Sequence, residues 1–457
     1  MAFRTTIKTI TALGFCLGVC LSTQSSRAQD ASGVLVNQNS AGILNFSQPE
    51  SAIKAYQIDN FLSELYNNNL FNGSIAVVDR GNLIYHQAYG WANFAQKDTL
   101  SLDTPFHLAS VSKQFTAMAI MILKEKGKLS YDDDICKYLP ELPYGGVTIR
   151  NLLHHNSGLP DYLNANLPVL QFFPKKELIT NDDLIKYFSV RKPKLLFKPG
   201  TQAAYCNTGY VFLASIVERV SGESFAHFLH HHIFQPLDMK STFIYNSRNI
   251  ETQISQDTVL VATDTLLEAY NELKVETTIK IQTRIKTVPK RRAYGYELSF
   301  PYPNGFELND FHPYDGIAGE KSVCASTADL IKWDQALHNN ALVSASTFKE
   351  AIRPSSVADH GHYKYGFGWK IFSDQPHKIF HAGLYAGFKT YIQRNLKDQT
   401  CIIVLSNRSI RGRVLAIADA IDDILEGRPY KGIKATKVEK STLHTFKQKY
   451  WIDYAKR

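Results

Sequence analysis

Residues 105–127 read PFHLASVSKQFTAMAIMILKEKG. From Gln114 to Leu123 the side chains are apolar on nearly every side, which is typical of a helix buried inside a domain. The Lys-Glu-Lys-Gly that follows supplies positive charge and then a glycine where that helix is expected to end. Ser110 is therefore expected in the first turn of a buried helix. Free amide N–H groups and the positive end of the helix dipole favour a developing oxyanion there.

A serine and a lysine in this stretch, Ser110 and Lys113, are three residues apart. This spacing places both side chains on one helix face, with the amine within reach of the hydroxyl. A buried ammonium group can lose its proton at neutral pH and then act as a base. A helix-capping serine followed by an ordinary lysine gives the same pattern, and the spacing recurs at Ser51–Lys54, Ser189–Lys192 and Ser346–Lys349.

The blocks that follow favour the catalytic reading of Ser110. They are TIRNLLHHNSGLPDY (148–162), FKPGT (197–201), YCNTGY (205–210), GE (319–320) with STADLIKW (326–333), YGFGW (365–369) and HAGLYAGF (381–388). In this order, over roughly residues 71–427, they resemble the serine β-lactamase-related family, which includes class C β-lactamases, penicillin-binding-protein-like hydrolases and esterases of the same fold. No G-x-S-x-G or H-E-x-x-H motif occurs, which argues against an α/β-hydrolase or a zinc protease.

The resemblance implies a mixed α/β fold of the α+β type, similar to β-lactamases and transpeptidases. Such a fold has an antiparallel sheet flanked by helices and a mostly helical subdomain, with the site at the seam between them. The local patterns agree, because strand patterns occupy both ends of the chain and helical patterns lie between. Helices are expected at 53–70 and 411–425, and strands at 73–79, 83–89, 378–381, 388–394 and 400–405.

The resemblance also implies roles for four residues. Ser110 attacks a carbonyl and forms an acyl-enzyme, and Lys113 takes the proton of the serine. Tyr205 passes that proton to the leaving group and helps to activate the water that releases the acid. Asn207 positions Lys113 and the substrate. These assignments predict two-step acyl transfer without any cofactor.

The last block departs from the Lys-Thr-Gly of β-lactamases, because His381, Ala382 and Gly383 occupy those positions. His381, Gly383 and Leu384 are expected to bind substrate, and the amide N–H groups of Ser110 and Leu384 to form an oxyanion hole at an edge strand. A neutral histidine and an alanine would deprive a substrate carboxylate of charge-assisted hydrogen bonds of roughly 1.5–3 kcal/mol each. This favours uncharged esters or amides.

Three classes of function stay open. The first is an exported esterase or amidase that cleaves a small-molecule ester, amide or peptide. The second is a penicillin-recognising enzyme: a β-lactamase, D-alanyl carboxypeptidase or D-aminopeptidase. The third is a non-catalytic protein on the same fold. No metal is expected, because the consecutive His230–His232, which lie near His227, point in different directions on a helix. Nothing resembles a nucleic-acid-binding module.

The first residues look like a targeting segment. Residues 1–28 carry two early basic residues, the apolar run Ile10 to Leu21 and small residues before a cut, as in a signal peptide. The run is too short to anchor the chain in a bilayer. Cys16 and Cys20 raise a lipoprotein alternative, but each follows a bulky residue where a small one is required. The protein is therefore expected to be exported, periplasmic or secreted, with a flexible lead at 29–50.

The formal net charge of +9 is unevenly spread. Residues 431–457 hold eight basic and two acidic residues and residues 1–28 hold three basic and no acidic ones, so the remainder is close to neutral. The chain is thus expected to have a hydrolase domain at 51–427 and a basic extension at 428–457. The extension suits either weak association with anionic envelope surfaces or simple solvation. An insertion at 251–292 forms either a lid or a surface elaboration. Free thiols are expected at Cys136, Cys206, Cys324 and Cys401.

Overall fold

The computed structural model describes residues 28–29, 35–36, 49–164, 166–245, 292–298, 306–357, 361, 363–410 and 412–434. The chain divides into two compact units, residues 1–41 and 42–457. In the first unit, strands β1 (Ala28–Gln29) and β2 (Leu35–Val36) pair antiparallel. This short pairing differs from the irregular lead that the sequence indicated from residue 29.

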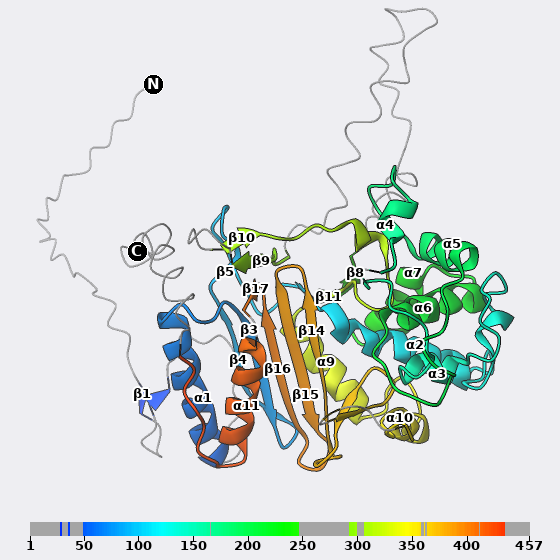
Figure 1. Cartoon of the computed structure of the whole chain (residues 1–457). Coiled ribbons are helices and arrows are strands. Elements are labelled where there is room, and N and C mark those ends of the chain that lie inside the picture. The colour runs from blue at the N-terminus through cyan, green and yellow to red at the C-terminus, as the bar shows by residue number, and fades with distance from the viewer. Residues whose placement is uncertain are drawn as a thin grey trace, which may run out of the picture. The chain divides into compact units, whose positions relative to one another are not determined.

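A seven-stranded antiparallel sheet forms the middle of the second unit (Figure 1). Its order, β12-β13-β14-β15-β16-β3-β4, joins strands from both ends of the chain, because β3 pairs with β16. The expected fold class is confirmed by this sheet and the helices around it. The strands are β3 (Gly73–Asp79), β4 (Asn82–Tyr89), β12 (Tyr363–Tyr365), β13 (Lys370–Phe372), β14 (Lys378–Tyr385), β15 (Phe388–Asn395) and β16 (Thr400–Ser406).

Both faces of the sheet are buried, which explains why β3 is apolar along nearly its whole length. Ile75 and Val77 join a core with the helices α1 (Pro49–Asn67) and α11 (Arg413–Leu425). Ala76 and Val78, which alternate with them along the strand, point the other way and join the larger core of the helical region. The predicted hairpin is present, since β3 and β4 are joined by Arg80 and Gly81, both with positive φ.

The helical region lies beside the sheet and is built around α2 (Lys113–Glu125), which is buried from Lys113 to Leu123, as its apolar run predicts. α2 packs against α6. The other elements here are η2 (Ile135–Lys137), α3 (Ile149–Leu153), α4 (Val169–Phe172), α5 (Asn181–Arg191), α6 (Asn207–Ser221), α7 (Phe225–Leu229) and the π-helical η3 (His230–Phe234).

Smaller elements connect the sheet and the helical region. α9 (Thr327–His338) packs on β3 and β16, on the face away from α1. Three small sheets have the orders β7-β11-β8, β10-β9-β17 and β5-β6. Bounds are β5 (Trp91–Asn93), β6 (Asp98–Thr99), β7 (Phe106–His107), η1 (Ala109–Ser112), β8 (Phe243–Ile244), β9 (Tyr296–Leu298), β10 (Phe306–Leu308), η6 (Pro313–Gly316), β11 (Val323–Ala325), α10 (Ala345–Ala351) and β17 (Arg408–Ser409).

Some expectations fall on residues that the structure does not describe. The signal peptide apart from Ala28, the insertion apart from Arg292 and the tail beyond residue 434 lie outside the described ranges. Within those ranges, no helix has the length and apolar character needed to cross a membrane. The four predicted thiols are unpaired, and all except Cys136 are buried.

Candidate active site

Ser110 lies in the short 3₁₀ turn η1, one turn before α2 begins at Lys113. The sequence indicated the first turn of the helix itself, so the helix starts slightly later than predicted. Side chains three residues apart lie directly above one another in a 3₁₀ turn, which brings Lys113 beneath Ser110. Ala109, just before the serine, has a φ of 50°, a left-handed conformation that costs a non-glycine residue energy and recurs at functional sites.

Lys113 is fully buried, and three acceptors surround its amine. Its Nζ lies 3.2 Å from Ser110 Oγ, 2.8 Å from Asn207 Oδ1 and 2.9 Å from the carbonyl oxygen of Glu320. Burial lowers the pKa of Lys113 to about 8, although the nearby Glu320 carboxylate acts in the opposite direction. The amine can therefore release its proton near neutral pH.

Tyr205 precedes α6 and reaches the same serine from the other side. Its hydroxyl donates to Ser110 Oγ at 2.9 Å, and its ring centroid lies 4.9 Å from Lys113 Nζ. Although 41% of the residue is exposed, burial around the hydroxyl raises the pKa of Tyr205 well above its usual value. Of the two groups beside Ser110, the lysine is thus the one that loses its proton more easily.

Asn207 is held by Asp161, a residue that the sequence analysis did not single out. The backbone N–H and the side-chain Nδ2 of Asn207 both donate to Asp161 Oδ2, at 2.7 and 2.9 Å. Because the amide nitrogen faces the carboxylate, Oδ1 is left facing Lys113 Nζ. Asp161 lies within the predicted 148–162 block, so its position was visible in the sequence while its contact was not.

A buried charge network lies under Lys113 and was also missed. Glu320 Oε1 accepts from Tyr162 at 2.6 Å and from Lys321 Nζ at 2.8 Å, and Glu320 Oε2 lies 3.8 Å from Lys113 Nζ. Burial acts to raise the pKa of Glu320, but the ammonium groups of Lys321 and Lys113 outweigh it and hold that pKa below its usual value. A carboxylate therefore persists beneath the amine.

Gly383 allows β14 to run against η1. A Cβ added at Gly383 would lie 2.2 Å from Thr390 Oγ1, 2.3 Å from the carbonyl oxygen of Leu108 and 3.0 Å from Ala109 Cβ. Leu384, the next residue, is 62% exposed. The sequence indicated an edge strand at Leu384, and β14 is paired with β13 only near its start, at Ile379 and Phe380. Among the strands that the structure describes, none pairs with β14 on that side from His381 onward.

The His381 side chain is buried and faces protein groups. Its Nδ1 donates to the carbonyl oxygen of Ala382 at 2.8 Å, so the neutral ring accepts the hydroxyl of Tyr365 at Nε2. Burial lowers the pKa of His381 well below its usual value, and the positive charges of Lys370 and Lys113 act in the same direction. The centroid of the His381 ring lies 6.4 Å from that of Tyr205, so an uncharged imidazole lies near the site.

Lys370 supplies a positive charge that the sequence analysis overlooked. It lies on β13 opposite Phe380, and its Nζ is 5.7 Å from the ring centroid of Tyr205 and 4.1 Å from that of Tyr363. Among the described residues, no carboxylate pairs with Lys370, whereas Lys113 and Lys321 both face Glu320. Lys370, the residue directly after YGFGW (365–369), therefore places a cation beside Tyr205.

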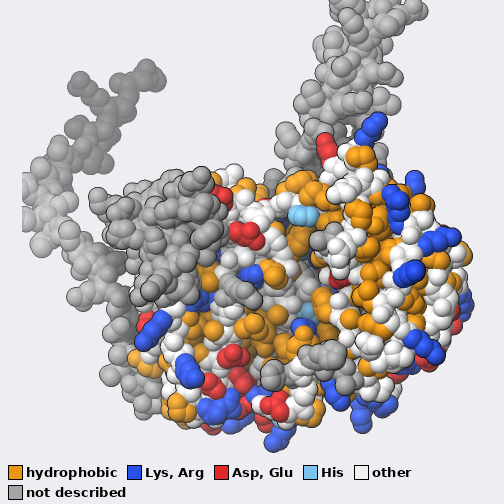
Figure 2. All heavy atoms as spheres, viewed as in Figure 1, with side chains coloured by type: hydrophobic (Ala, Val, Ile, Leu, Met, Phe, Trp, Pro, Cys, Tyr) orange, Lys and Arg blue, Asp and Glu red, His pale blue; other side chains and the backbone are white. Residues whose placement is uncertain are grey.

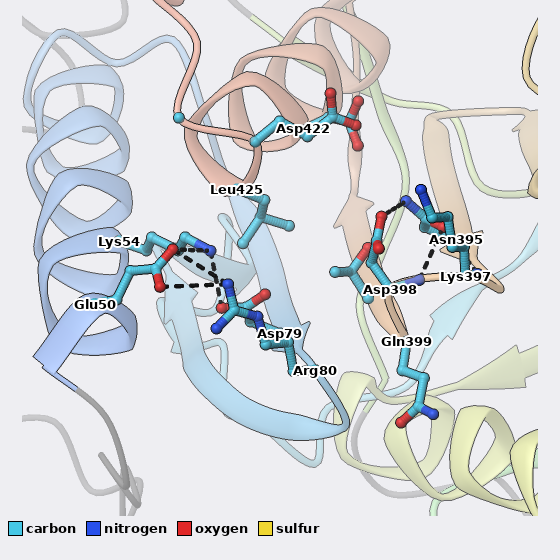
Figure 3. Close-up of a pocket in the computed structure, with 13 residues that line it drawn as sticks. Glu50, Lys54, Asp79, Arg80, Asn395, Lys397, Asp398, Gln399, Asp422 and Leu425 are labelled. Atoms are coloured by element: carbon cyan, nitrogen blue, oxygen red, sulfur yellow. Dashed lines mark hydrogen bonds and ion pairs between the residues drawn. The ribbon is translucent and has the colours of Figure 1, made fainter.

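The molecular surface is hollowed between the sheet and the helical region, and hydrophobic side chains surround the hollow (Figure 2). Leu384 and Tyr205 are among the exposed large hydrophobic residues. A second hollow of about 670 Å³ lies elsewhere, between α1, α11 and the β15–β16 turn. Some of its charged groups pair with each other, as Lys54 does with Glu50 and Asp79 (Figure 3). It contains none of the predicted catalytic residues.

Comparisons with known proteins show the family and the fold of the chain. The family model described as Beta-lactamase matches residues 58–426. The chain is 32% identical over 373 residues to "Penicillin-binding protein 4*" of Bacillus subtilis strain 168, covering 79% of this chain and 73% of that protein. It is 26% identical over 356 residues to the putative penicillin-binding protein PbpX of the same strain, covering 77% and 73%. The octameric penicillin-binding protein homologue from Pyrococcus abyssi superposes with a TM-score of 0.63 at 22% identity, covering 86% of this chain and 80% of that one.

Proposed function

Because the chain belongs to the beta-lactamase family, we propose that it is a serine hydrolase that cleaves ester or amide bonds through an acyl-enzyme on Ser110. The observation that carries this proposal is the convergence of two groups on one serine oxygen. Lys113 Nζ and Tyr205 Oη lie 3.2 and 2.9 Å from Ser110 Oγ. A base and a proton carrier within hydrogen-bonding distance are what an alcohol needs to act as a nucleophile.

The reaction has two halves. Ser110 Oγ adds to the substrate carbonyl carbon while its proton passes to the free amine of Lys113, and the carbonyl oxygen becomes an oxyanion. The carbon–oxygen or carbon–nitrogen bond to the leaving group then breaks, and Tyr205 delivers the proton to that group. Water attacks the acyl-serine ester by the reverse proton path, which releases a carboxylic acid and restores the Ser110 hydroxyl. The amide N–H groups of Ser110 and Leu384 are proposed to stabilise the oxyanion.

We propose neutral esters or amides as the preferred substrates. His381 is uncharged and already bonded to Tyr365, and the next position is Ala382, so neither residue offers the charge-assisted hydrogen bond that a substrate carboxylate requires. The exposed side chain of Leu384 adds apolar surface beside the serine. A small uncharged acyl group suits such surroundings.

A penicillin-recognising activity is the second candidate, and Lys370 is the observation that favours it. An ammonium group 5.7 Å from the Tyr205 ring, without a carboxylate partner among the described residues, can attract a substrate carboxylate. The relative at 32% identity also carries the name of a penicillin-binding protein. This candidate predicts hydrolysis of β-lactams or D-alanyl peptides through the same acyl-Ser110.

Hydrolysis of p-nitrophenyl butyrate by matched serine variants tests the proposed function. Ser110→Ala should abolish turnover without unfolding the protein. Ser189→Ala, which changes the serine of another Ser-x-x-Lys pair at the end of α5, should leave the rate unchanged. Substantial hydrolysis by a folded Ser110→Ala protein would refute the assignment.

A substrate panel separates the two candidates. If neutral esters are preferred, kcat/KM for p-nitrophenyl butyrate should exceed that for nitrocefin, and Lys370→Met should leave the ester rate nearly unchanged. If the penicillin-directed candidate holds, nitrocefin is the better substrate and Lys370→Met lowers its kcat/KM selectively. The ratio of the two specificity constants, measured in both proteins, decides between them.

We also propose that the protein is exported, on the basis of residues 1–28, and that the basic residues beyond 428 associate weakly with anionic envelope surfaces. Mass spectrometry of the secreted or periplasmic protein should find a mature N-terminus near residue 29. Sedimentation with anionic vesicles should fall when residues 435–457 are removed. An intact N-terminus on protein confined to the cytoplasm would contradict the first proposal.

A further inference from the structure

A cluster of metal-ligating side chains lies away from the serine, where α6 turns into α7. Glu223, His227 and His231 are spaced four residues apart, and one ligand atom from each lies within 4.8 Å of the others. Glu223 Oε2 is 3.3 Å from His227 Nδ1 and 3.4 Å from His231 Nδ1. The two imidazole rings lie with their centroids 3.9 Å apart and their planes tilted by 56°.

These separations match those around a tetrahedral ion. Zn²⁺ binds imidazole nitrogen and carboxylate oxygen at about 2.0–2.2 Å, so two ligand atoms on adjacent corners of a tetrahedron lie roughly 3.3–3.6 Å apart. The two oxygen–nitrogen distances at Glu223 are 3.3 and 3.4 Å. The third separation, between the ligand nitrogens of His227 and His231, is at most 4.8 Å, so an ion beside Glu223 requires at most a modest closing of the two imidazole rings.

The consecutive histidines alone do not form this cluster, which is why the sequence analysis set a metal aside. Positions 230–232 do diverge, but His227 and His231 are one turn apart and therefore share a face. The π-helical η3 begins at His230, and such widened turns are frequent at functional sites. In this turn His231 and His232 both reach Glu223, one to each carboxylate oxygen.

His232 contacts the second oxygen of the Glu223 carboxylate, the one that does not face His227 and His231. Its Nε2 lies 3.3 Å from Glu223 Oε1, and Lys126 Nζ lies 3.5 Å from its Nδ1. Because an ammonium group can only donate, Nδ1 is the accepting nitrogen and Nε2 carries the proton that points at Glu223. A hydrogen bond from outside that fixes a ligating carboxylate is the usual support of a metal ligand.

We propose that Glu223, His227 and His231 bind a divalent transition-metal ion of the Zn²⁺ type, with the remaining position open to water. Two imidazoles and one carboxylate suit Zn²⁺, Ni²⁺ or Cu²⁺ rather than Mg²⁺ or Ca²⁺, which prefer oxygen ligands alone. The side chains of His227 and His231 are 58% and 43% exposed, so the ion can enter from solvent. The cluster lies near the C-terminal end of α2, because Lys126, the residue that ends this helix, contacts His232. Ser110 precedes the opposite end of the same helix. The ion therefore stabilises the fold and takes no part in acyl transfer.

Calorimetric titration of the untagged, chelator-treated full chain with ZnCl₂ tests this site. Wild-type protein should show one Zn²⁺ equivalent that His227→Gln, His231→Gln and Glu223→Gln each weaken by about tenfold or more. His230→Gln, which removes an exposed neighbouring histidine outside the cluster, should retain wild-type affinity. MgCl₂ should produce no binding, and Zn²⁺ should raise the melting temperature of wild-type and His230→Gln proteins but not of His227→Gln.

Two results would overturn the proposal. The first is the absence of a Zn²⁺ equivalent in the wild-type titration. The second is retention of wild-type affinity by folded His227→Gln and His231→Gln proteins, which would place the bound ion on other histidines of the chain. Circular dichroism of each variant shows that it is folded before the titration is interpreted. Ester hydrolysis should be equal in the metal-free and zinc-loaded proteins.

Discussion

At the scale of single residues, the proposed chemistry depends on the difference in pKa between Lys113 and Tyr205, the two titratable groups that contact Ser110 Oγ. Burial brings the pKa of Lys113 down to about 8 and raises that of Tyr205, so the amine is the proton acceptor and the phenol remains protonated. Asn207 and the carbonyl oxygen of Glu320 hold the amine in line with Ser110. The nucleophile and base were visible in the Ser-x-x-Lys spacing, but the groups that tune the base were not.

The first prediction concerns pH. The active form requires the free amine of Lys113, whose pKa is about 8. Specificity constants for a neutral ester should therefore rise with pH, increase about tenfold per unit well below pH 8, and level off above it. The measurement is kcat/KM for p-nitrophenyl butyrate from pH 6 to 9.5, corrected for spontaneous hydrolysis. A profile that is flat from pH 6 to 9 would exclude Lys113 as the base.

The second prediction concerns coupling between Lys113 and Tyr205. Lys113→Met and Tyr205→Phe should each reduce kcat by about 10²–10⁴-fold, the range for a positioned acid or base. The double variant should lose less than the product of the two single losses, because both groups serve one proton path. Single-turnover rates of the four proteins give the comparison, and fully multiplicative losses would show that the two groups act independently.

At the scale of elements, the chemistry depends on the close approach of β14 to η1. Gly383 permits this approach, and the Thr390 hydroxyl on β15 fastens it by donating to the carbonyl oxygen of Leu108 at 2.7 Å. The strand that carries Leu384 is thereby held against the turn that carries Ser110. The sequence placed a strand at 378–381 and the glycine after it. The distance between that strand and a turn about 270 residues earlier is a tertiary property that no local pattern carries.

The third prediction tests this contact with glycine variants. Gly383→Ala would place a methyl group 2.2–2.3 Å from Thr390 Oγ1 and Leu108 O, so η1 must shift away from β14. Overpacking of this kind costs about 1–3 kcal/mol of stability, and displacement of a nucleophile can cost about 10² in rate. Gly145→Ala, which meets nothing within 4 Å, is the control and should change neither quantity. Wild-type activity in Gly383→Ala would contradict the described packing.

At the scale of the whole molecule, a network beneath the site joins distant segments. Glu320 and Lys321 precede β11, Tyr162 ends the 148–162 block, and Lys113 begins α2. All four side chains are almost completely buried. A buried ion pair of this kind contributes little net stability, but it is costly to break because the remaining charge has no partner.

The fourth prediction follows from the cost of leaving one buried charge without its partner. Glu320→Gln should lower the free energy of unfolding by about 3–5 kcal/mol, since it strands the buried ammonium of Lys321. Glu320→Gln/Lys321→Met should lose less. The single variant should also move the pH profile of hydrolysis to lower pH, because the lost carboxylate favours the charged form of Lys113. Urea unfolding and the pH profile check both parts, and a double variant less stable than the single one would contradict the network.

Much of the architecture followed from the sequence because local patterns carry it. The expected strands 73–79, 388–394 and 400–405 agree with β3, β15 and β16 to within a residue, and the expected helix 411–425 agrees with α11. β3 and β16 are mostly continuous apolar runs, and α11 carries its apolar residues at helical spacing. The start of α2 was placed too early, because residues three apart, such as Ser110 and Lys113, lie on one face in a 3₁₀ turn as well as in an α-helix.

The site was predicted less completely than the fold. Ser110, Lys113, Tyr205 and Asn207 meet as the resemblance implied, but Asp161 and Lys370 did not stand out. Their importance comes from partners far along the chain, Asn207 in one case and Tyr205 in the other. His381 was expected to face the substrate, yet its ring is bonded to Tyr365. Whether a strand residue turns toward a cleft or toward its neighbours depends on packing that one sequence does not reveal.

Peptide mapping after reaction with a fluorophosphonate probe tests the central claim most directly. The probe phosphonylates an activated serine, and mass spectrometry of the digested protein locates the adduct. Wild-type and Ser189→Ala proteins should carry a single adduct on the peptide that contains Ser110, and Ser110→Ala should carry none. An adduct on another residue, or an unlabelled wild-type protein that still hydrolyses esters, would contradict the assignment of Ser110 as the nucleophile.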